Sequence, residues 1–160
     1  MISIGIRVTY NEIHYSIVKY DNNIHTTLSI SKLKVPKALD NPCKLSFLRN
    51  TFETIIKQYK INRAGIKLIE GNARLTHNAN TFFRFNIEGV LLELFSNSSI
   101  EKYILGLASN IASALEIQSK PVKDMVQDLG IDDSITTDEK KKLTDEDKEA
   151  LVVAIAALAI

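Results

Sequence analysis

Carboxylates at two places in the chain have the position and spacing to hold a metal ion or to act as acid and base. Glu70 follows a short apolar run over residues 66–69, which predicts the end of a buried strand, where ligands collect in α/β sheets. Glu146 and Glu149 lie three residues apart at the head of the last predicted helix and therefore share a face. Each position also has a structural explanation, because a loop-start glutamate can point to water and a helix dipole favours carboxylates at its N-terminus.

The histidines and the other acids of the last helix add little to this candidate site. His77 lies in the loop after the short strand and within reach of a site there, whereas His14 and His25 are expected as cross-strand neighbours on an exposed face. Asp145 and Asp147 leave open which carboxylates of the last helix matter. The chain contains no metal-ligand histidine spacing, no phosphate-binding or dinucleotide-binding glycine loop, and no nucleophile elbow.

The composition is that of one ordinary globular domain. A chain of 160 residues can bury a proper core but is too short for two ordinary domains, so a single domain over residues 1–160 is expected. Apolar residues make up 45% and charged residues 24%, far from the disordered class. The formal net charge is +1, so the whole chain does not attract nucleic acid strongly. A single cysteine excludes an internal disulfide and a cysteine-based zinc cluster.

The sequence predicts a cytoplasmic protein without a membrane partner. The longest wholly apolar run, residues 151–160, has ten residues and cannot span a bilayer. The first residues alternate between apolar and polar, which differs from the basic-then-apolar start of a secretory signal.

The near-neutral total hides two halves of opposite charge. Residues 1–70 carry eleven basic and five acidic residues, whereas residues 71–160 carry nine basic and fourteen acidic residues. The basic excess lies over residues 32–67 and the acidic excess over residues 124–149. Two solvated faces would explain the asymmetry, and so would a contact with a second copy or a protein partner through opposite charges.

The pattern of apolar residues predicts a mixed α/β fold. Three segments of alternation at the start predict antiparallel strands joined by tight turns, and a helix should follow with Asn41 as its N-cap and Pro42 in its first turn. Short apolar runs predict two further strands, at residues 66–69 and 100–105. Further helices are expected over residues 78–95, 108–115 and 120–129 and from 145 to the end, with an exposed charged loop over residues 131–144. This order predicts a mixed sheet flanked by helices.

Several segments, taken in order, resemble the RuvC-like resolvases of the RNase H-like superfamily. Residues 2–7, Ile-Ser-Ile-Gly-Ile-Arg, look like the first strand of that family, which normally reads apolar-Gly-Ile-Asp. The other matching segments are the strand end at 67–70, the loop and long helix at 78–90, the stretch 119–126 with Lys120, and the closing helix at 149–154 with Glu146 three residues before it. The matches are short, but together they cover nearly the whole chain.

The resemblance implies a five-stranded sheet in the order 3-2-1-4-5 and a chemistry of two-metal phosphodiester hydrolysis. The first-strand aspartate of the family bridges both metals, and Arg7 stands in its place. A guanidinium cannot ligate a metal and does not lose its proton in a protein. We therefore expect Arg7 to block the site by pairing with Glu70 and Glu149, unless the strand register is different and Arg7 points outward.

Two functions are compatible with this resemblance. The first is a non-catalytic pseudo-nuclease that acts as a binding or scaffolding subunit and needs no metal or cofactor. The alternative is a Mg²⁺-dependent DNA endonuclease with Glu70, Glu146 and Glu149 as ligands and with Lys120 and His77 as additional site residues. A binder of small molecules or peptides at the carboxyl edge of the sheet also stays open, as does nucleic-acid binding.

The helix predicted over residues 78–95 indicates a homodimer. It is apolar nearly all round, which is more apolar surface than one face of a sheet can cover. Phe82, Phe85, Gly89 and Leu92 are the expected interface, since a glycine in a helix favours close backbone approach. RuvC-like proteins dimerise through the corresponding helix. The alternative is complete burial of this helix within one chain.

Overall fold

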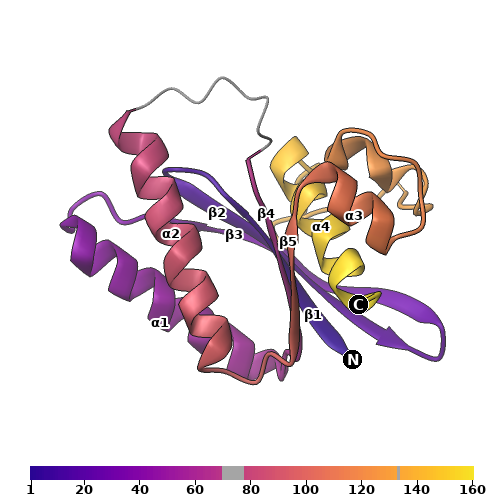
Figure 1. Cartoon of the computed structure of the whole chain (residues 1–160), viewed down its shortest axis with the longest axis horizontal. Coiled ribbons are helices and arrows are strands. Elements are labelled where there is room, and N and C mark those ends of the chain that lie inside the picture. Colours follow the sequence, from indigo (N-terminus) through magenta and orange to yellow (C-terminus); the bar gives the residue numbers. More distant parts are fainter. Residues whose placement is uncertain (70–77, 133) are drawn as a thin grey trace.

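A five-stranded mixed sheet forms the centre of the protein (Figure 1). The structure is a computed structural model and describes residues 1–69, 78–132 and 134–160. The strands β1 (Ile2–Val8), β2 (Glu12–Asp21), β3 (Ile24–Lys34), β4 (Arg63–Lys67) and β5 (Lys102–Gly106) lie in the order β3-β2-β1-β4-β5. The first three are antiparallel, and β4 and β5 run parallel to β1. The predicted fold class and strand order are therefore confirmed.

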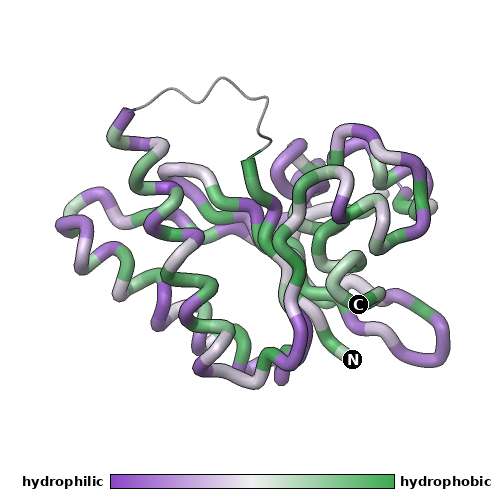
Figure 2. Tube along the Cα trace, in the orientation of Figure 1, coloured by the Kyte–Doolittle hydropathy of each residue, from purple (hydrophilic) through white to green (hydrophobic). Residues whose placement is uncertain are grey.

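Helices cover both faces of the sheet. The helices α1 (Asn41–Tyr59) and α2 (Ala79–Ser96) pack on one face, and α3 (Ala108–Ala114), the short 3₁₀ helix η1 (Val122–Val126) and α4 (Asp145–Leu158) pack on the other. Hydrophobic residues concentrate in the central strands, while the outer helix α1 carries many hydrophilic ones (Figure 2). No described helix is both long and apolar enough to cross a membrane.

The alternation of β1 decides which of its side chains meets which helix layer. Ile4 and Ile6 are fully buried in the core below α1 and α2. On the other face, the Ser3 hydroxyl donates a 2.7 Å hydrogen bond to the carbonyl oxygen of Ala154 in α4. A Cβ at Gly5 would overlap the backbone of Ala150 and Ala154, so only glycine lets α4 lie this close to the sheet. The register therefore turns the next residue on this face, Arg7, toward α4.

The first and last residues of β4 and β5 are set by pairing with the neighbouring strands and do not coincide with the apolar runs in the sequence. The prediction of a strand over 66–69 was wrong at both ends, because β4 pairs with β1 from Arg63 opposite Ser3 to Lys67 opposite Arg7. The strand β5 likewise begins at Lys102, opposite Arg63, and not at residue 100.

Two helix predictions also need correction. The N-cap of α1 is Asp40, whose carboxylate accepts the backbone N–H of Cys43 at 2.9 Å, and Asn41 is already helical. The helix expected over 120–129 is only the 3₁₀ helix η1, since Val122 and Met125 pack against α4 three residues apart, as the tighter helix requires. By contrast, α2 and α4 begin within one residue of their predicted starts, at the caps Asn78 and Thr144.

Candidate site at the carboxyl ends of β1 and β4

Four basic side chains form one transverse row across the sheet. The strand register places Lys32 of β3 opposite His14 of β2, and His14 opposite Arg7 of β1. Arg7 in turn lies opposite Lys67, the last residue of β4. Cross-strand partners share a face of the sheet, so this row faces α4 at the carboxyl ends of β1 and β4. In an α/β sheet, this edge is where ligand sites form.

The first turns of α4 bring carboxylates to this row. Arg7 donates through its Nε to the carboxylate of Glu149, and it also donates to the carbonyl oxygen of Val8 at 3.1 Å. The ion pair of Arg7 with Glu149 that the sequence predicted is confirmed, and Arg7 does not point outward. The two side chains are 19% and 18% exposed, so the pair is largely but not fully removed from water.

A second, more deeply buried pair lies beside the first. His14 Nδ1 lies 2.7 Å from Asp147 Oδ1, and both residues are buried. Asp147 also accepts hydrogen bonds from the backbone N–H and the hydroxyl of Thr144, each at 2.9 Å, which closes the capping box of α4. Burial acts to raise the pKa of the Asp147 carboxyl, but the hydrogen bonds from His14 and Thr144 outweigh it and hold that pKa below its ordinary value.

The helix α2 adds a third pair from the other side of the sheet. Arg84 Nε donates to Glu88 Oε1 at 3.0 Å, one helical turn away, and both side chains are nearly buried. Burial raises the pKa of Glu88, although Arg84, Arg7 and Lys67 all act to lower it. Burial also lowers the pKa of Arg84, and the positive charge of Arg7 lowers it further. These influences show that α2, β1 and β4 converge on one group of charges.

We call Arg7, Lys67, Arg84, Glu88 and Glu149 the charge cluster. It contains three basic residues and two carboxylates, and each carboxylate is influenced by more than one of the cations. The Lys67 ammonium, on a residue buried in the fold, also donates to the carbonyl oxygen of Leu68 at 2.6 Å. The cluster therefore combines basic and acidic side chains at the edge where the resemblance predicted two metal ions.

The other predicted site residues have different positions. Glu146 is half-buried in the first turn of α4, and within the part of the chain that the structure describes it forms no ion pair. Lys120 pairs with Asp128 at 2.8 Å and not with a carboxylate of α4. Glu70 and His77 lie outside the described residues.

The sequence did not single out Lys67, Arg84, Glu88 or His14 as site residues. His14 was expected on an exposed face opposite His25, but it is buried against α4 and lies opposite Arg7. One signal was available: Arg84 and Glu88 are four residues apart in an otherwise apolar helix, which is the spacing of an ion pair.

The described residues do not fit a two-metal centre. Over residues 1–69, 78–132 and 134–160, no three His, Cys, Asp or Glu side chains come close enough together to hold a metal ion. Glu149 is engaged by Arg7, and Glu88 by Arg84. Two unit positive charges about 4 Å apart repel each other by roughly 4 kcal/mol at an effective dielectric near 20, and a divalent ion beside Arg7 would feel about twice that.

Comparison with known proteins supports the fold and leaves the activity open. No family model matches the sequence, and no curated protein matches it either. Among solved structures, RuvC of Thermus thermophilus in complex with a Holliday junction substrate is similar, with a TM-score of 0.71 and 13% identity, over 99% of this chain and 94% of that one. The yeast mitochondrial Holliday junction resolvase matches with a TM-score of 0.64 and 15% identity, over 98% of this chain and 77% of that one.

A viral enzyme extends the same comparison. The Holliday junction resolvase of fowlpox virus matches with a TM-score of 0.51 and 16% identity, over 98% of this chain and 96% of that one. At such low identity, the similarity shows a common fold and no more. The chain thus has the RNase H-like fold of RuvC over its whole length, and its charge cluster lies at the carboxyl ends of β1 and β4 within that fold.

Proposed function

We propose that this protein is a non-catalytic relative of the RuvC-type resolvases that acts as a binding or scaffolding subunit. One observation carries the proposal: Arg7 occupies the central position of the candidate site and is paired with Glu149. A carboxylate oxygen that accepts a hydrogen bond from a guanidinium is not available as a metal ligand. On this proposal the ion pairs replace the metals, and no metal or cofactor is required.

The rest of the charge cluster supports the same conclusion. Glu88 already has Arg84 as its partner, and Lys67 and Arg7 add further positive charge beside it. Binding two dications here would require these cations to move away or to lose charge, and arginine does not lose its proton in a protein. The ion pair of Arg7 with Glu149 instead connects the end of β1 to α4.

The test is a cleavage assay on a four-way DNA junction and on single-stranded DNA, with Mg²⁺ or Mn²⁺ and an active resolvase as positive control. We expect no cleavage above the protein-free control with the wild type or with Glu70→Gln. The competing function, a metal-dependent endonuclease with Glu70, Glu146 and Glu149 as ligands, predicts cleavage that requires the metal and disappears in Glu70→Gln and Glu149→Gln. That result would overturn the proposal.

We also propose that the protein forms a homodimer through α2. Phe82 and Phe85 are 56% and 42% exposed and lie on one stripe of this helix with Gly89 and the half-buried Leu92. A Cβ at Gly89 would have open space around it, so within one chain nothing requires a glycine at this position. An apolar stripe with a glycine at its centre fits close packing against a second copy of the same helix.

A further inference from the structure

The outer strand β3 is covered along only part of its open edge. At Ile30, the backbone N–H donates to the Asp138 carboxylate at 3.0 Å, and the carbonyl oxygen accepts the Asp138 backbone N–H at 2.9 Å. The hydroxyl of Ser29 also donates to the Asp138 carboxylate, at 2.6 Å. This part of the edge is therefore paired as if another strand lay beside it.

The first half of β3 has no such cover. Residues 24–28 are all exposed, and the side chain of Ile24 is 63% exposed. On the neighbouring strand, the backbone N–H of Tyr20 donates to the carbonyl oxygen of Met1, away from β3. His25 lies opposite Tyr20, so the backbone N–H and C=O of His25 must point away from β2, to the open edge of β3. Orientation alternates along an antiparallel strand, so the backbone groups of Thr27, two residues on, also point to the open edge. Within the described chain, no group bonds these backbone atoms of His25 and Thr27.

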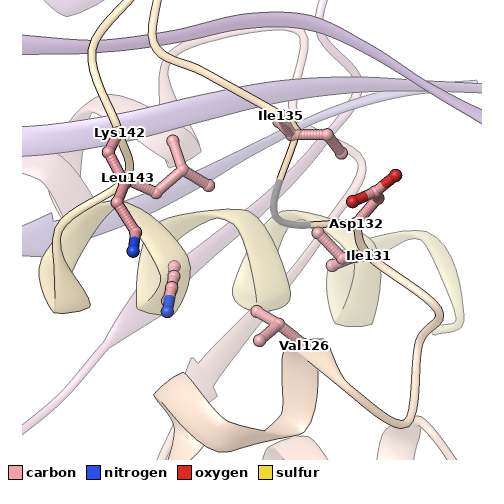
Figure 3. Close-up of a pocket in the computed structure, with 7 residues that line it drawn as sticks. Val126, Ile131, Asp132, Ile135, Lys142 and Leu143 are labelled. Atoms are coloured by element: carbon pink, nitrogen blue, oxygen red, sulfur yellow. The ribbon is translucent and has the colours of Figure 1, made fainter.

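A pocket with mostly aliphatic side chains in its wall lies directly beside this open edge. It has a volume of about 170 Å³, and the side chains of His25 and Thr27 line it together with Val18, Leu129, Ile131 and Leu151. The adjoining cavity between Val126 and Leu143 has only about 10 Å³, no more than one water molecule needs (Figure 3). Ile131, Ile135 and Leu143 pack against the core that α4 forms, and the larger empty space lies on the side of the open strand edge.

The open edge of β3 and the pocket beside it together indicate what kind of partner binds there. A strand that bonds to His25 and Thr27 places alternate side chains on the face of the sheet that holds the pocket. If the partner were β3 of a second copy, paired antiparallel, Thr27 and His25 of that copy would lie over the pocket, and both are polar. Six aliphatic side chains line the pocket away from this edge, and an aliphatic side chain of a partner would contact them. Asp132 is exposed next to Ile131 in the acidic part of the chain, which favours a basic residue nearby.

We propose that the open half of β3 binds an extended peptide segment of another protein by strand addition, with an aliphatic side chain in the pocket beside His25 and Thr27. The peptide pairs with β3 on the far side of the irregularity at Leu28 from the Asp138 contact, and it carries a basic residue toward Asp132. This surface is separate from the charge cluster and from the apolar stripe of α2. The proposal therefore holds whether or not the protein cleaves DNA, and it does not depend on the homodimer.

The experiment is a selection of displayed random heptapeptides on the folded protein, followed by titration of the selected peptide into ¹⁵N-labelled protein. We expect selected sequences with aliphatic residues at alternate positions next to a basic residue, and chemical-shift changes centred on the amides of His25 and Thr27. A peptide N-methylated at the amide that bonds β3 should bind about tenfold more weakly or worse, because one hydrogen bond is lost without any change in the protein.

Two variants test the site from the side of the protein. Thr27→Pro removes an outward N–H from an edge strand, where proline is tolerated, and should weaken binding by about tenfold or more. Thr26→Val is the matched control: its backbone is already paired with Lys19, so binding should be unchanged.

Three outcomes would overturn the proposal. The first is a selection that enriches no sequence over the same selection on Thr27→Pro. The second is a selected peptide that shifts only residues of α2 or of the charge cluster. The third is self-association of the wild type that Thr27→Pro abolishes, which would make a second copy the occupant of this edge.

Discussion

At the scale of single residues, Arg7 determines what the site can do. It lies between Lys67 and His14 in the register of the sheet, and its guanidinium engages Glu149 of α4. A side chain in this position influences three neighbours at once, since it also affects the pKa values of Arg84 and Glu88. On the proposed function, this one residue places a guanidinium where a metal ligand would be needed.

Removing the guanidinium should cost stability. Arg7→Ala leaves Glu149 without its partner, and we expect the free energy of unfolding to fall by about 2–3 kcal/mol. The loss is smaller than for a fully buried pair because about a fifth of each side chain is exposed. Urea denaturation measures it. Arg49→Ala is the control, because its pairs with Glu53 and Glu93 are more exposed and should be worth less than about 1 kcal/mol. Equal losses in both variants would contradict a special role for Arg7.

Restoring a carboxylate at position 7 should restore metal binding. We expect Arg7→Asp to be less stable than wild type without metal and to gain melting temperature with millimolar Mg²⁺ or Mn²⁺, because a ligand that binds only the native state stabilises it. The wild type should not respond. Arg7→Asn removes the same positive charge without adding a carboxylate, and it should also stay unresponsive. A wild type strongly stabilised by metal would remove the main support for the non-catalytic function.

Asp147 should make the protein sensitive to acid. Its pKa in the folded state lies below the unfolded value of 3.8, so its contribution to stability is fully present above that pH and disappears as the pH falls toward the folded pKa. Melting temperatures between pH 6 and pH 3 should therefore fall more steeply for wild type than for Asp147→Asn. The exposed neighbour Asp145 provides the control variant Asp145→Asn, which should follow wild type. If the melting temperatures of wild type and Asp147→Asn fell in parallel with pH, the Asp147 carboxylate would contribute no pH-dependent stability.

At the scale of the elements, the close contact of β1 with α4 positions the site. Ser3 bonds the backbone of α4 and Gly5 allows the helix to approach, so Arg7, next on the same face, meets Glu149. The capping box at Thr144 sets where α4 begins, and with it the position of every carboxylate in the first two turns. The geometry of the charges is thus a consequence of helix packing and capping.

Two glycine substitutions separate this packing requirement from helix propensity. Gly5→Ala drives a methyl group into the backbone of α4 and should lower the free energy of unfolding by about 3 kcal/mol or more, or prevent folding. Gly89→Ala meets only open space in α2 and should raise the stability of the monomer by about 0.5–1 kcal/mol. Thermal melts of both variants make the comparison. A harmless Gly5→Ala would mean that α4 does not lie as close to β1 as the structure places it.

At the scale of the whole molecule, two exposed surfaces indicate where partners could bind. The outward stripe of α2 and the edge of β3 lie in different parts of the molecule (Figure 1). Since the two proposed surfaces differ, a second copy and a peptide partner could bind at the same time.

The homodimer gives a test at this scale. We expect light scattering at tens of micromolar to give the mass of a dimer for wild type and of a monomer for Phe85→Asp, because a charge on the apolar stripe must be desolvated on association. Ile24→Asp places the same charge on a more exposed apolar residue of the β2–β3 hairpin and should leave the dimer intact. A monomeric wild type would count against the proposed interface.

Local patterns were sufficient for the type and order of the elements. Alternation over the first 31 residues predicted three antiparallel strands, and the predicted helix starts at residues 78 and 145 lie within one residue of the starts of α2 and α4. These predictions succeeded because each depends on residues close together in the chain. The pairing of Arg7 with Glu149 was predicted from the resemblance to the RuvC-like resolvases, while alternation indicated only that Arg7 shares a face with Ser3 and Gly5.

Apart from the pair of Arg7 with Glu149, only the tertiary structure showed which charged residues meet. His14 and Asp147 are 133 residues apart, and nothing near either residue shows that β2 will carry one against the N-terminus of α4 where the other lies. The spacing of Arg84 and Glu88 allows an ion pair within α2, but it does not show that Arg7 acts on this pair. The pairing of β4 with β1 sets the ends of β4 at Arg63 and Lys67. The apolar run over residues 66–69 therefore predicted the wrong bounds for this strand. Sequence determines the faces of each element, but the contacts between elements depend on how those faces pack, and the charge cluster is made of such contacts.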